Sequence, residues 1–303
     1  MTALDFDRLR SLRATAPGIV ARSLVSRPRR PLFVDDRRLF IIAADHTARG
    51  AFGIRSQPMA MGDRYDLLER LAAALANPAV DGVLATPDIL QDLAVLGRLD
   101  GKLAVGSMNR GGLSGATFEM DDRVTAYGPA DLATAGVDFA KFLLRVNLAD
   151  AGSAATLERA AEAVTASARA ELPIMLEPFL SRWQGDAIVN DLDADSVIRS
   201  VAIASGLGAS TAYTWLKLPV VEQMDRVMAA TTLPTLLLGG DPDSGPDETF
   251  ASWERALALP GVRGLVVGRT LLYPSDDDVD AAVGTAARLV HGDIRSPIPQ
   301  RTP

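Results

Sequence analysis

The chain of 303 residues contains no cysteine, only two histidines and only three lysines. Without cysteine it has no disulfide framework and no thiolate chemistry. His46 and His291 are too few and too far apart in sequence for zinc, which needs several imidazole or thiolate ligands. We therefore predict no zinc-dependent chemistry and no cofactor, while an all-oxygen magnesium site stays open. Almost all of the 31 basic residues are arginines, which cannot act as amine nucleophiles, so a lysine in an apolar strand is a candidate nucleophile.

The sequence also lacks long hydrophobic runs. No apolar stretch approaches the roughly 18 residues that a membrane span needs. The N-terminal MTALDFDRLRSLR has no apolar signal-peptide region. With the lack of cysteine, these features predict a cytoplasmic protein without a membrane partner. The net charge of −7 gives no reason to expect a nucleic-acid partner. One basic stretch, residues 22–30, is interpreted as a solvated linker or an oligomer contact.

Eight short apolar runs alternate with helical patterns along the chain. Near-continuous apolar strands separated by helices are typical of a parallel sheet covered by helices. Eight strand–helix units in roughly 250 residues predict an α/β fold, the (β/α)8 TIM barrel. A doubly wound sheet is the alternative, but the G-x-G-x-x-G turn that usually accompanies it is absent. The predicted strands are residues 39–45, 80–86, 102–108, 137–145, 173–177, 213–218, 234–239 and 262–268. The predicted helices are residues 64–75, 157–170, 195–205 (with Asp195 as candidate N-cap), 220–230 and 249–259.

We divide the chain into three parts. Residues 1–38 are predicted to form an extra helix and linker before the barrel. Residues 39–292 are predicted to form the catalytic barrel, and the proline-rich residues 293–303 an extended tail. Such barrels commonly assemble into oligomers, so we expect a homo-oligomer.

Four ionisable residues fall at or near the carboxyl ends of four different predicted strands. They are Asp45, Lys141, Glu177 and Lys217. Active sites of these barrels lie at that end of the strands, and lysine is rarely buried unpaired. A strand-ending carboxylate is often only a helix cap, yet two lysines with two acids support one another as a catalytic group. Lys102 begins its strand, at the opposite face, and is interpreted as structural.

Two glycine-rich segments follow the last two predicted strands. Phosphate sites in these barrels form from the loops after strands seven and eight, where backbone N–H groups approach the ligand. Gly239 and Gly240 open the first segment, and Gly268 with Arg269 opens the second. Glycine permits close approach and arginine adds a charge-assisted hydrogen bond. Ordinary turns would look similar, but two such loops at the expected places favour a bound sugar phosphate.

The predicted chemistry is that of a class I aldolase. A lysine amine attacks a ketone to form an iminium, which accepts electrons when a neighbouring C–C bond breaks. A carboxylate takes the proton of the substrate hydroxyl and moves protons during the carbinolamine steps. Lys217 is the candidate nucleophile, and Glu177 and Asp45 are the candidate bases. The phosphate would anchor the substrate and position the reacting carbons.

Several segments resemble known class I aldolases in order and in strand placement. VDFAKFLLRVN (137–147), IMLEPFL (174–180) and WLKLPV (215–220) resemble strands of tagatose-1,6-bisphosphate aldolases. LLLGGDPD (236–243) and VVGRTLLYP (266–274) are similar to the phosphate loops shared with archaeal-type fructose-bisphosphate aldolases. AADHTARG (43–50) resembles the opening Asp motif of both. The resemblance covers roughly residues 39–292 and extends to the deoxyribose-phosphate aldolase kind.

This resemblance implies roles for individual residues. Lys217 would be the Schiff-base lysine, Glu177 the proton-transfer acid, and Asp45 with Lys141 the pair that handles the substrate. The chain departs from the tagatose enzymes after the strand-four lysine, where Arg145 and Asn147 replace aromatic residues.

The arginine at position 145 suggests a substrate with an additional anionic group. The overall pattern looks like an actinobacterial branch associated with inositol breakdown. That branch implies cleavage of 2-deoxy-5-keto-6-phosphogluconate to dihydroxyacetone phosphate and malonate semialdehyde. Arg145, Arg49 or Arg55 would hold the carboxylate of this substrate.

Three other functions stay open at this point. The first is an aldolase for another sugar phosphate, such as a hexose bisphosphate, a sulfo-sugar phosphate or deoxyribose phosphate. The second is a barrel that binds a sugar phosphate without C–C chemistry. The third alternative is an isomerase or epimerase that uses the carboxylates and tolerates loss of Lys217.

Overall fold

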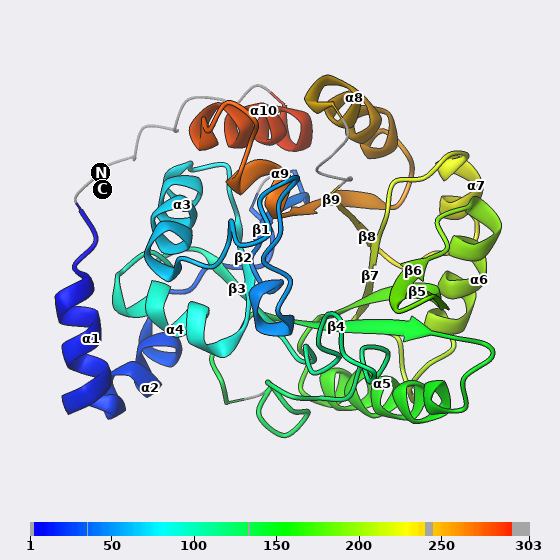
Figure 1. Ribbon diagram of the computed structural model, residues 1–303, viewed down its shortest axis with the longest axis horizontal. Coiled ribbons are helices and arrows are strands. Elements are labelled where there is room, and N and C mark those ends of the chain that lie inside the picture. Colours follow the sequence, from blue (N-terminus) through cyan, green and yellow to red (C-terminus); the bar gives the residue numbers. More distant parts are fainter. Residues whose placement is uncertain (1–2, 35, 133, 240–244, 293–303) are drawn as a thin grey trace, which may run out of the picture.

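The computed structural model describes residues 3–34, 36–132, 134–239 and 245–292. Eight parallel strands pair in sequence order, and the last pairs with the first, which closes a barrel (Figure 1). The predicted (β/α)8 barrel is therefore confirmed. Its strands are β1 (Leu39–Ala43), β2 (Gly82–Ala85), β3 (Leu103–Ser107), β4 (Phe139–Val146), β5 (Ile174–Gln184), β7 (Thr214–Leu218), β8 (Thr235–Leu238) and β9 (Val262–Val267).

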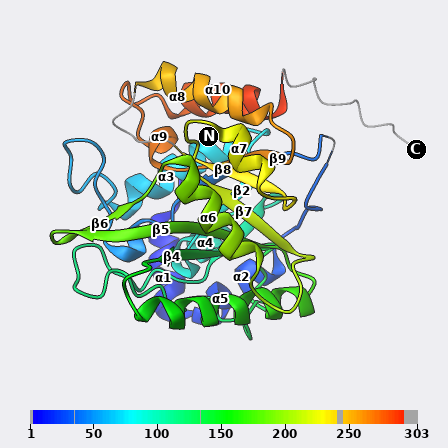
Figure 2. The ribbon, with the colours of Figure 1, turned by 90° about the vertical axis from the view of Figure 1, so that its right-hand side faces the viewer.

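Helices surround the barrel on its outer side, as Figures 1 and 2 show. The longer ones are α3 (Arg64–Ala76), α4 (Pro87–Val95), α5 (Gly152–Arg169), α6 (Ala194–Ser205), α7 (Met224–Ala229), α8 (Pro246–Leu257) and α10 (Val279–His291). Two short turns of helix, η1 (Thr47–Arg49) and α9 (Arg269–Leu272), follow β1 and β9. Within the described residues, no helix is both long enough and apolar enough to cross a membrane.

The helix starts differ from the sequence prediction where local capping decides them. The side chain of Asp193 accepts a hydrogen bond from the Ser196 backbone N–H (2.9 Å), so Asp193 is the N-cap of α6 and the prediction of Asp195 was wrong. Helix α7 starts four residues later than expected, because Gln223 has a left-handed backbone (φ 57°) that interrupts a helix. Helices α4 and α10 were not predicted.

Side chains inside the barrel form layers, because every second residue of a strand points inward. The lower layers are apolar. They contain Leu39, Ile41, Ala43, Leu84, Leu103, Val105, Phe139, Met175, Trp215, Leu236 and Val266. On three strands the next inward position toward the carboxyl end is ionisable: Lys141 follows Phe139, Glu177 follows Met175, and Lys217 follows Trp215. Because side chains alternate along each strand, a polar layer lies directly above the apolar layers inside the barrel.

Strand β5 extends beyond the barrel, a feature that the sequence analysis missed. After Glu177 it continues to Gln184 and pairs antiparallel with β6 (Ala187–Asn190) through a turn at Gly185 (φ 62°). Figure 2 shows this hairpin reaching out from the barrel. It builds up the wall on one side of the carboxyl-terminal face.

The N-terminal segment forms two helices instead of the one expected, α1 (Phe6–Thr15) and α2 (Pro17–Ser26), and α2 packs against α4 (Figure 1). Proline at position 17 begins a new helix, since proline favours the first helical position. The stretch after α2 ties this segment to the barrel: Arg27 forms an ion pair with Asp138, and Arg30 with Asp81.

The interpretation of residues 22–30 as a solvated linker was therefore wrong at Arg27, whose side chain is only 1% exposed. The predicted extended tail, residues 293–303, lies outside the described residues.

Candidate active site

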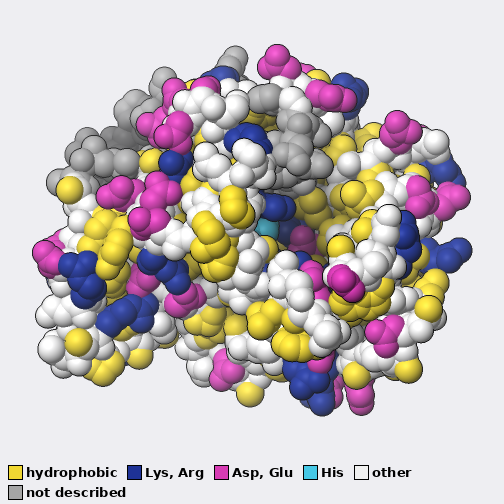
Figure 3. All heavy atoms as spheres, in the orientation of Figure 1, with side chains coloured by type: hydrophobic (Ala, Val, Ile, Leu, Met, Phe, Trp, Pro, Cys, Tyr) yellow, Lys and Arg dark blue, Asp and Glu magenta, His cyan; other side chains and the backbone are white. Residues whose placement is uncertain are grey.

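A polar layer lies above the apolar interior, at the carboxyl ends of the strands. Asp45 follows β1, Ser107 ends β3, and Lys141, Glu177 and Lys217 lie on β4, β5 and β7. All five side chains are buried. Figure 3 shows a hollow in the molecule with acidic, basic and histidine side chains at its bottom. The four ionisable residues predicted from strand ends are thus brought together in space.

Glu177 lies between the two lysines. Its Oε1 accepts a hydrogen bond from Nζ of Lys217 at 2.5 Å. Nζ of Lys141 forms an ion pair with the other oxygen, Oε2, in a geometry that is not that of a hydrogen bond. Burial by itself would raise the pKa of Glu177, but Lys141 and Lys217 outweigh it and hold that pKa well below the usual value. Glu177 is therefore a carboxylate in direct contact with two amines.

Asp45 forms the second half of the polar layer. Its Oδ2 accepts hydrogen bonds from Oγ of Ser107 (2.9 Å), Nε of Arg110 (2.7 Å) and Nζ of Lys141 (3.4 Å). Its Oδ1 is buried and has no hydrogen-bond partner among the described residues. Burial would raise the pKa of Asp45, yet Arg110 and Lys141 keep it well below the usual value. Asp45 is therefore an ionised acceptor with one oxygen to spare.

Lys141 is completely enclosed and joins the two carboxylates. Burial and the neighbouring Arg110 lower the pKa of Lys141 to about 8, against the opposing effect of Asp45 and Glu177. The layer holds three cationic side chains, Lys141, Lys217 and Arg110, against the carboxylates of Asp45 and Glu177. This excess of positive charge favours an anionic ligand and the loss of a proton from a lysine.

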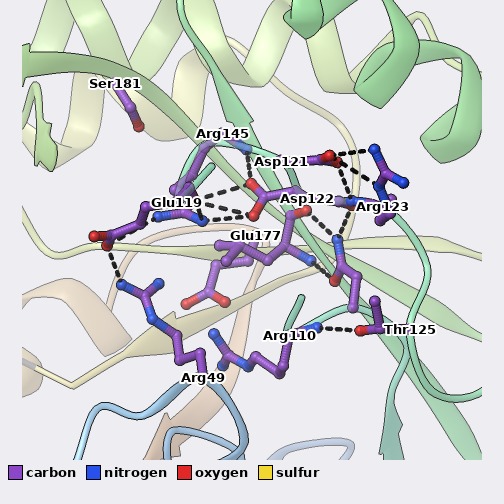
Figure 4. A network of polar contacts seen from close by, with 12 residues as sticks. Arg49, Arg110, Glu119, Asp121, Asp122, Arg123, Thr125, Arg145, Glu177 and Ser181 are labelled. Atoms are coloured by element: carbon purple, nitrogen blue, oxygen red, sulfur yellow. Dashed lines mark hydrogen bonds and ion pairs between the residues drawn. The ribbon is translucent and has the colours of Figure 1, made fainter. Parts of the chain in front are cut away.

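The loop after β3 contributes residues that the sequence analysis missed. Arg110, Glu119 and Asp122 all lie in it and reach the neighbourhood of Glu177 (Figure 4). Asn109 fixes the start of this loop, because its side chain accepts from the Leu143 backbone N–H (2.7 Å) and donates to the Leu143 carbonyl (2.7 Å). Arg110 comes three residues after the end of β3, so a search of each strand's carboxyl end extended by three residues would have found it.

The three arginines proposed for the substrate carboxylate have different surroundings. Arg145 is buried and makes a side-on pair with Asp122, with distances of 3.0 Å from Nε to Oδ2 and 2.7 Å from Nη2 to Oδ1. Nη2 of Arg49 donates to Oε1 of Glu119 at 2.8 Å. Arg55 donates instead to the Tyr273 carbonyl at 3.1 Å. The binding of a substrate by Arg145 or Arg49 stays a prediction.

Gly239 and Gly268, two of the glycines predicted to bind phosphate, lie at the same end of the barrel. Gly268 comes directly after β9 and lies next to the end of β1. A Cβ atom at this position would lie 2.1 Å from the Ala43 carbonyl oxygen. Strand packing alone therefore requires glycine at this position. Gly239 follows β8, and Arg269 begins the short helix α9. Gly240 lies outside the described residues. The role of these residues in phosphate binding stays a prediction.

His46 follows Asp45 at the end of β1. Burial lowers the pKa of His46 to about 3, although Asp45 opposes this effect. The imidazole is therefore neutral near pH 7, and its Nδ1 has no hydrogen-bond partner among the described residues. No group of three His, Cys, Asp or Glu side chains in the described ranges is arranged to hold a metal ion.

Solved structures of known enzymes share this barrel architecture. An archaeal fructose 1,6-bisphosphate aldolase matches with a TM-score of 0.64 and 18% sequence identity, over 90% of this chain and 99% of that one. A fructose-bisphosphate aldolase from Slackia heliotrinireducens DSM 20476 matches with a TM-score of 0.60 and 16% identity, over 86% and 88% of the two chains. At these identities the likeness shows the fold alone, and it confirms at that level the resemblance to archaeal-type fructose-bisphosphate aldolases.

A comparison with family models assigns the chain to a family. The model of the Cgl0159-like family matches residues 37–287, and the chain belongs to this family. The crystal structure of Cgl0159 from Corynebacterium glutamicum matches with a TM-score of 0.93 and 63% identity, over 95% of this chain and 97% of that one. A search among curated proteins gave no match.

Proposed function

We propose that this protein is a class I aldolase that cleaves a ketose phosphate through a Schiff base on Lys217. The observation that carries the proposal is the contact of one carboxylate, Glu177, with the amines of both Lys217 and Lys141 in a buried layer. A Schiff-base mechanism needs an amine that can lose its proton and an acid–base group beside it. The contact between Glu177 and Lys217 places such an acid–base group beside the amine.

Lys217 is the better nucleophile of the two lysines because of its position. Lys141 is fully enclosed and is held by both Asp45 and Glu177, whereas the Lys217 side chain keeps 4% of its surface exposed and, among the described residues, forms an ion pair with Glu177 alone. A substrate carbonyl entering from the hollow reaches the less enclosed amine first. Lys141 would then remain a fixed cation that stabilises negative charge on the substrate or on the acids.

The reaction would proceed in steps that conserve protons and electrons. Glu177 takes a proton from Lys217, whose Nζ lone pair attacks the ketone carbon to give a carbinolamine. Glu177 returns a proton to the carbinolamine oxygen, water leaves, and the iminium forms. A carboxylate, Asp45 or Glu177, then removes the proton of the hydroxyl two carbons from the iminium. The bond between the hydroxyl-bearing carbon and the carbon next to the iminium then breaks. Its electron pair forms an enamine, and the hydroxyl-bearing carbon departs as an aldehyde. Protonation of the enamine and hydrolysis release the second product and the free lysine.

The substrate that we propose is 2-deoxy-5-keto-6-phosphogluconate, as expected for a branch concerned with inositol breakdown. Its ketone carbon C5 would react with Lys217, and its C3–C4 bond would break to give dihydroxyacetone phosphate and malonate semialdehyde. The excess of cationic side chains around Asp45 and Glu177 suits a substrate with both a phosphate and a carboxylate. The phosphate would lie toward the loops after β8 and β9.

The direct test is borohydride trapping with dihydroxyacetone phosphate, followed by peptide mass spectrometry. With only three lysines in the chain, each possible side-chain adduct falls in a different sequence context. We expect a stable adduct on Lys217 in the wild-type protein and in a Lys102→Arg control, and none in Lys217→Arg.

An adduct on Lys141 in the wild type would keep the Schiff-base chemistry and reverse the roles of the two lysines. No adduct on folded protein, with this donor or with fructose 1,6-bisphosphate, would rule out the aldolase and favour the binding-protein or isomerase alternatives. Release of dihydroxyacetone phosphate from fructose 1,6-bisphosphate as fast as from the proposed substrate would favour a hexose bisphosphate aldolase.

A further inference from the structure

Arg49, Arg110 and Arg145 lie around the Glu177 side of the site (Figure 4). Each of the three is paired with a carboxylate. Arg110 pairs with Asp45, Arg145 with Asp122, and Arg49 with Glu119. They come from different parts of the chain: Arg49 from η1 after β1, Arg110 from the loop after β3, and Arg145 from β4. The proposed chemical steps give Arg49 and Glu119 no role, and their pair differs from the other two.

Two of the pairs are complete and are fixed to the barrel. Asp122 accepts from both Nε and Nη2 of Arg145, and its Oδ2 also accepts from the Arg145 backbone N–H at 2.9 Å. Asp45 follows strand β1 and is held by Arg110 and Ser107 together. Displacing either carboxylate would break several buried hydrogen bonds at once, so neither guanidinium is available to a ligand without a large cost.

The pair of Arg49 and Glu119 is only half made. Glu119 accepts from Nη2 of Arg49 at 2.8 Å, while its other oxygen accepts from the Gly115 backbone N–H at 2.7 Å. Nε of Arg49 is buried and has no hydrogen-bond partner among the described residues. A guanidinium binds a carboxylate best through two parallel N–H groups. Arg49 could bind an anion through both Nε and Nη2, and in the free protein only Nη2 of these two is used by the described residues.

We propose that Arg49 binds a carboxylate of the substrate remote from its phosphate, and that the Glu119 side chain occupies the place of this carboxylate in the free protein. The proposal rests on the aldolase function and names a second anionic group as the feature that selects the substrate. The selecting residue is then Arg49, with Arg145 serving to hold the loop that carries Glu119.

The exchange of one carboxylate for another keeps the charge of Arg49 balanced. Arg49 keeps a negative partner throughout, and the incoming carboxylate gains the bond to Nε. The backbone of Glu119 stays in place, because Nη2 of Arg145 donates to its carbonyl oxygen. The side chain has to rotate, and it gives up the bond from the Gly115 backbone N–H and the ion pair with Nη1 of Arg145. Burial and the positive charges of Arg145 and Arg110 lower the pKa of Arg49 to about 10, which reflects a cationic surrounding that a second substrate anion would relieve.

The test compares two aldehydes in the condensation direction, with dihydroxyacetone phosphate as the donor. Malonate semialdehyde and propanal have the same three-carbon chain, but only the first carries a carboxylate. The measured quantity is the ratio of kcat/KM for malonate semialdehyde to that for propanal. Arg49→Lys keeps the charge and loses the two-point geometry, so we expect this ratio to fall about 10- to 100-fold.

Glu119→Gln should act in the opposite direction. The amide is a weaker competitor for Arg49 than the carboxylate, so we expect KM for malonate semialdehyde to fall about 3- to 10-fold with little change in kcat. Arg159→Lys is the matched control, because Arg159 forms an exposed pair with Glu162 at 2.7 Å on α5, which covers the outside of the barrel. The ratio of the two aldehydes should be the same in this variant as in the wild type.

The outcomes separate this inference from the aldolase proposal. A wild-type adduct on Lys217 together with an unchanged ratio in both Arg49→Lys and Glu119→Gln overturns the inference and leaves the aldolase standing. An equal loss with both aldehydes shows a structural role for Arg49 and also overturns it. A wild-type protein without an adduct removes the aldolase proposal, and the inference falls with it. If circular dichroism shows that Arg49→Lys is unfolded, Glu119→Gln decides the question.

Discussion

Ion pairs are buried at both ends of the barrel, but the carboxylates at the two ends have different hydrogen-bond partners. At the amino-terminal end, Asp138 accepts from the Ala104 backbone N–H (2.8 Å) and pairs with Arg27 and Arg29. At the carboxyl-terminal end, Asp45 bonds to side chains, and its Oδ1 has no partner among the described residues. Charges tied to the backbone hold strands and the N-terminal segment in place. Charges tied to one another can exchange protons and partners.

The remaining contacts at the amino-terminal end follow the same pattern. Asp81 accepts from the Phe40 backbone N–H at 2.7 Å and pairs with Arg30. Phe33 packs below the barrel interior with its ring centroid 5.8 Å from that of Trp215. The stretch after α2 therefore closes this end of the barrel, while the other end stays hollow.

The lysines show what this contrast teaches. Burial lowers the pKa of Lys102 and the pKa of Lys141, each to about 8. Yet Nζ of Lys102 donates to the carbonyl oxygens of Asn77 (3.0 Å) and Val80 (2.5 Å), whereas Lys141 contacts two carboxylates. A low lysine pKa thus occurs at both ends, and the partners distinguish a structural lysine from a candidate catalytic one. This agrees with the interpretation of Lys102 as structural.

The largest effect that would test this contrast is the loss of Lys217. In Lys217→Met we expect the retro-aldol rate to fall by about four orders of magnitude, because no other group can form the iminium at that position. Lys102→Met should retain its turnover. Steady-state release of dihydroxyacetone phosphate measures both variants. A Lys217→Met protein with more than about a hundredth of the wild-type rate would contradict the assignment.

The second effect concerns proton transfer by Glu177. In Glu177→Gln we expect kcat to fall about 100- to 1000-fold, because the amide cannot move protons through the carbinolamine. Lys217 should still give a borohydride adduct at high concentrations of dihydroxyacetone phosphate. Turnover and trapping on the same preparation measure the two quantities. Wild-type turnover in this variant would show that another group carries the proton, with Asp45 the first to examine.

The third effect belongs to the amino-terminal end and should appear in stability without a change in turnover. In Asp138→Asn we expect the free energy of unfolding to fall by about 3 kcal/mol, because the Arg27 guanidinium stays buried without its counter-charge. Urea denaturation measures this change. The exposed pair of Arg159 and Glu162 supplies the control, since Glu162→Gln should change stability little. A loss of turnover in folded Asp138→Asn would break the separation of the two ends.

The last effect, modest for each unit of pH, is a pH dependence of stability that comes from Lys102. Its pKa is about 8 in the folded protein and near 10.5 in the unfolded chain. Between these values the folded lysine has lost its proton while the unfolded one keeps it. Stability therefore rises with pH in this window, by at most about 1.4 kcal/mol per pH unit.

Lys102→Met should flatten this rise between pH 8 and pH 10, and it should leave the pH profile of kcat unchanged. Urea denaturation at several pH values gives the slopes, and the difference between the wild type and the variant isolates Lys102. Equal slopes in the two proteins would show that Lys102 does not titrate in this range. A shifted pH profile of kcat would connect Lys102 to the catalytic end after all.

Much of the fold could be predicted because the apolar periodicity is local. All eight barrel strands fall within or overlap the apolar runs of the sequence, and the helix predicted at residues 64–75 is α3. Helices α4 and α10 were missed, and so was the hairpin of β5 and β6. Strand β5 continues past Glu177 through a proline, and its outer part has intermediate or exposed side chains that lack the pattern of a buried strand.

The site was predictable in its strand residues and not in its loop residues. Asp45, Lys141, Glu177 and Lys217 stand out because an ionisable residue interrupts or closes an apolar run. Glu119 and Asp122 lie in a loop where acids are common, and nothing in the sequence shows which of them turn inward. Their burial depends on the path of that loop over the site, including a close approach at Gly112, where a Cβ atom would lie 2.3 Å from the Glu119 carbonyl oxygen.

The sequence by itself determined the barrel, its apolar interior and the four ionisable strand residues, since these follow from periodicities of two and about four residues. Only the tertiary structure decided which amine meets which acid, that Arg145 is already paired with Asp122, and that Arg49 meets Glu119 through Nη2 while its Nε has no partner among the described residues. The physical reason is range. A strand's alternation is fixed by neighbours in the chain, whereas an ion pair joins side chains 40 or 70 residues apart, as in Lys217 with Glu177 and Arg49 with Glu119.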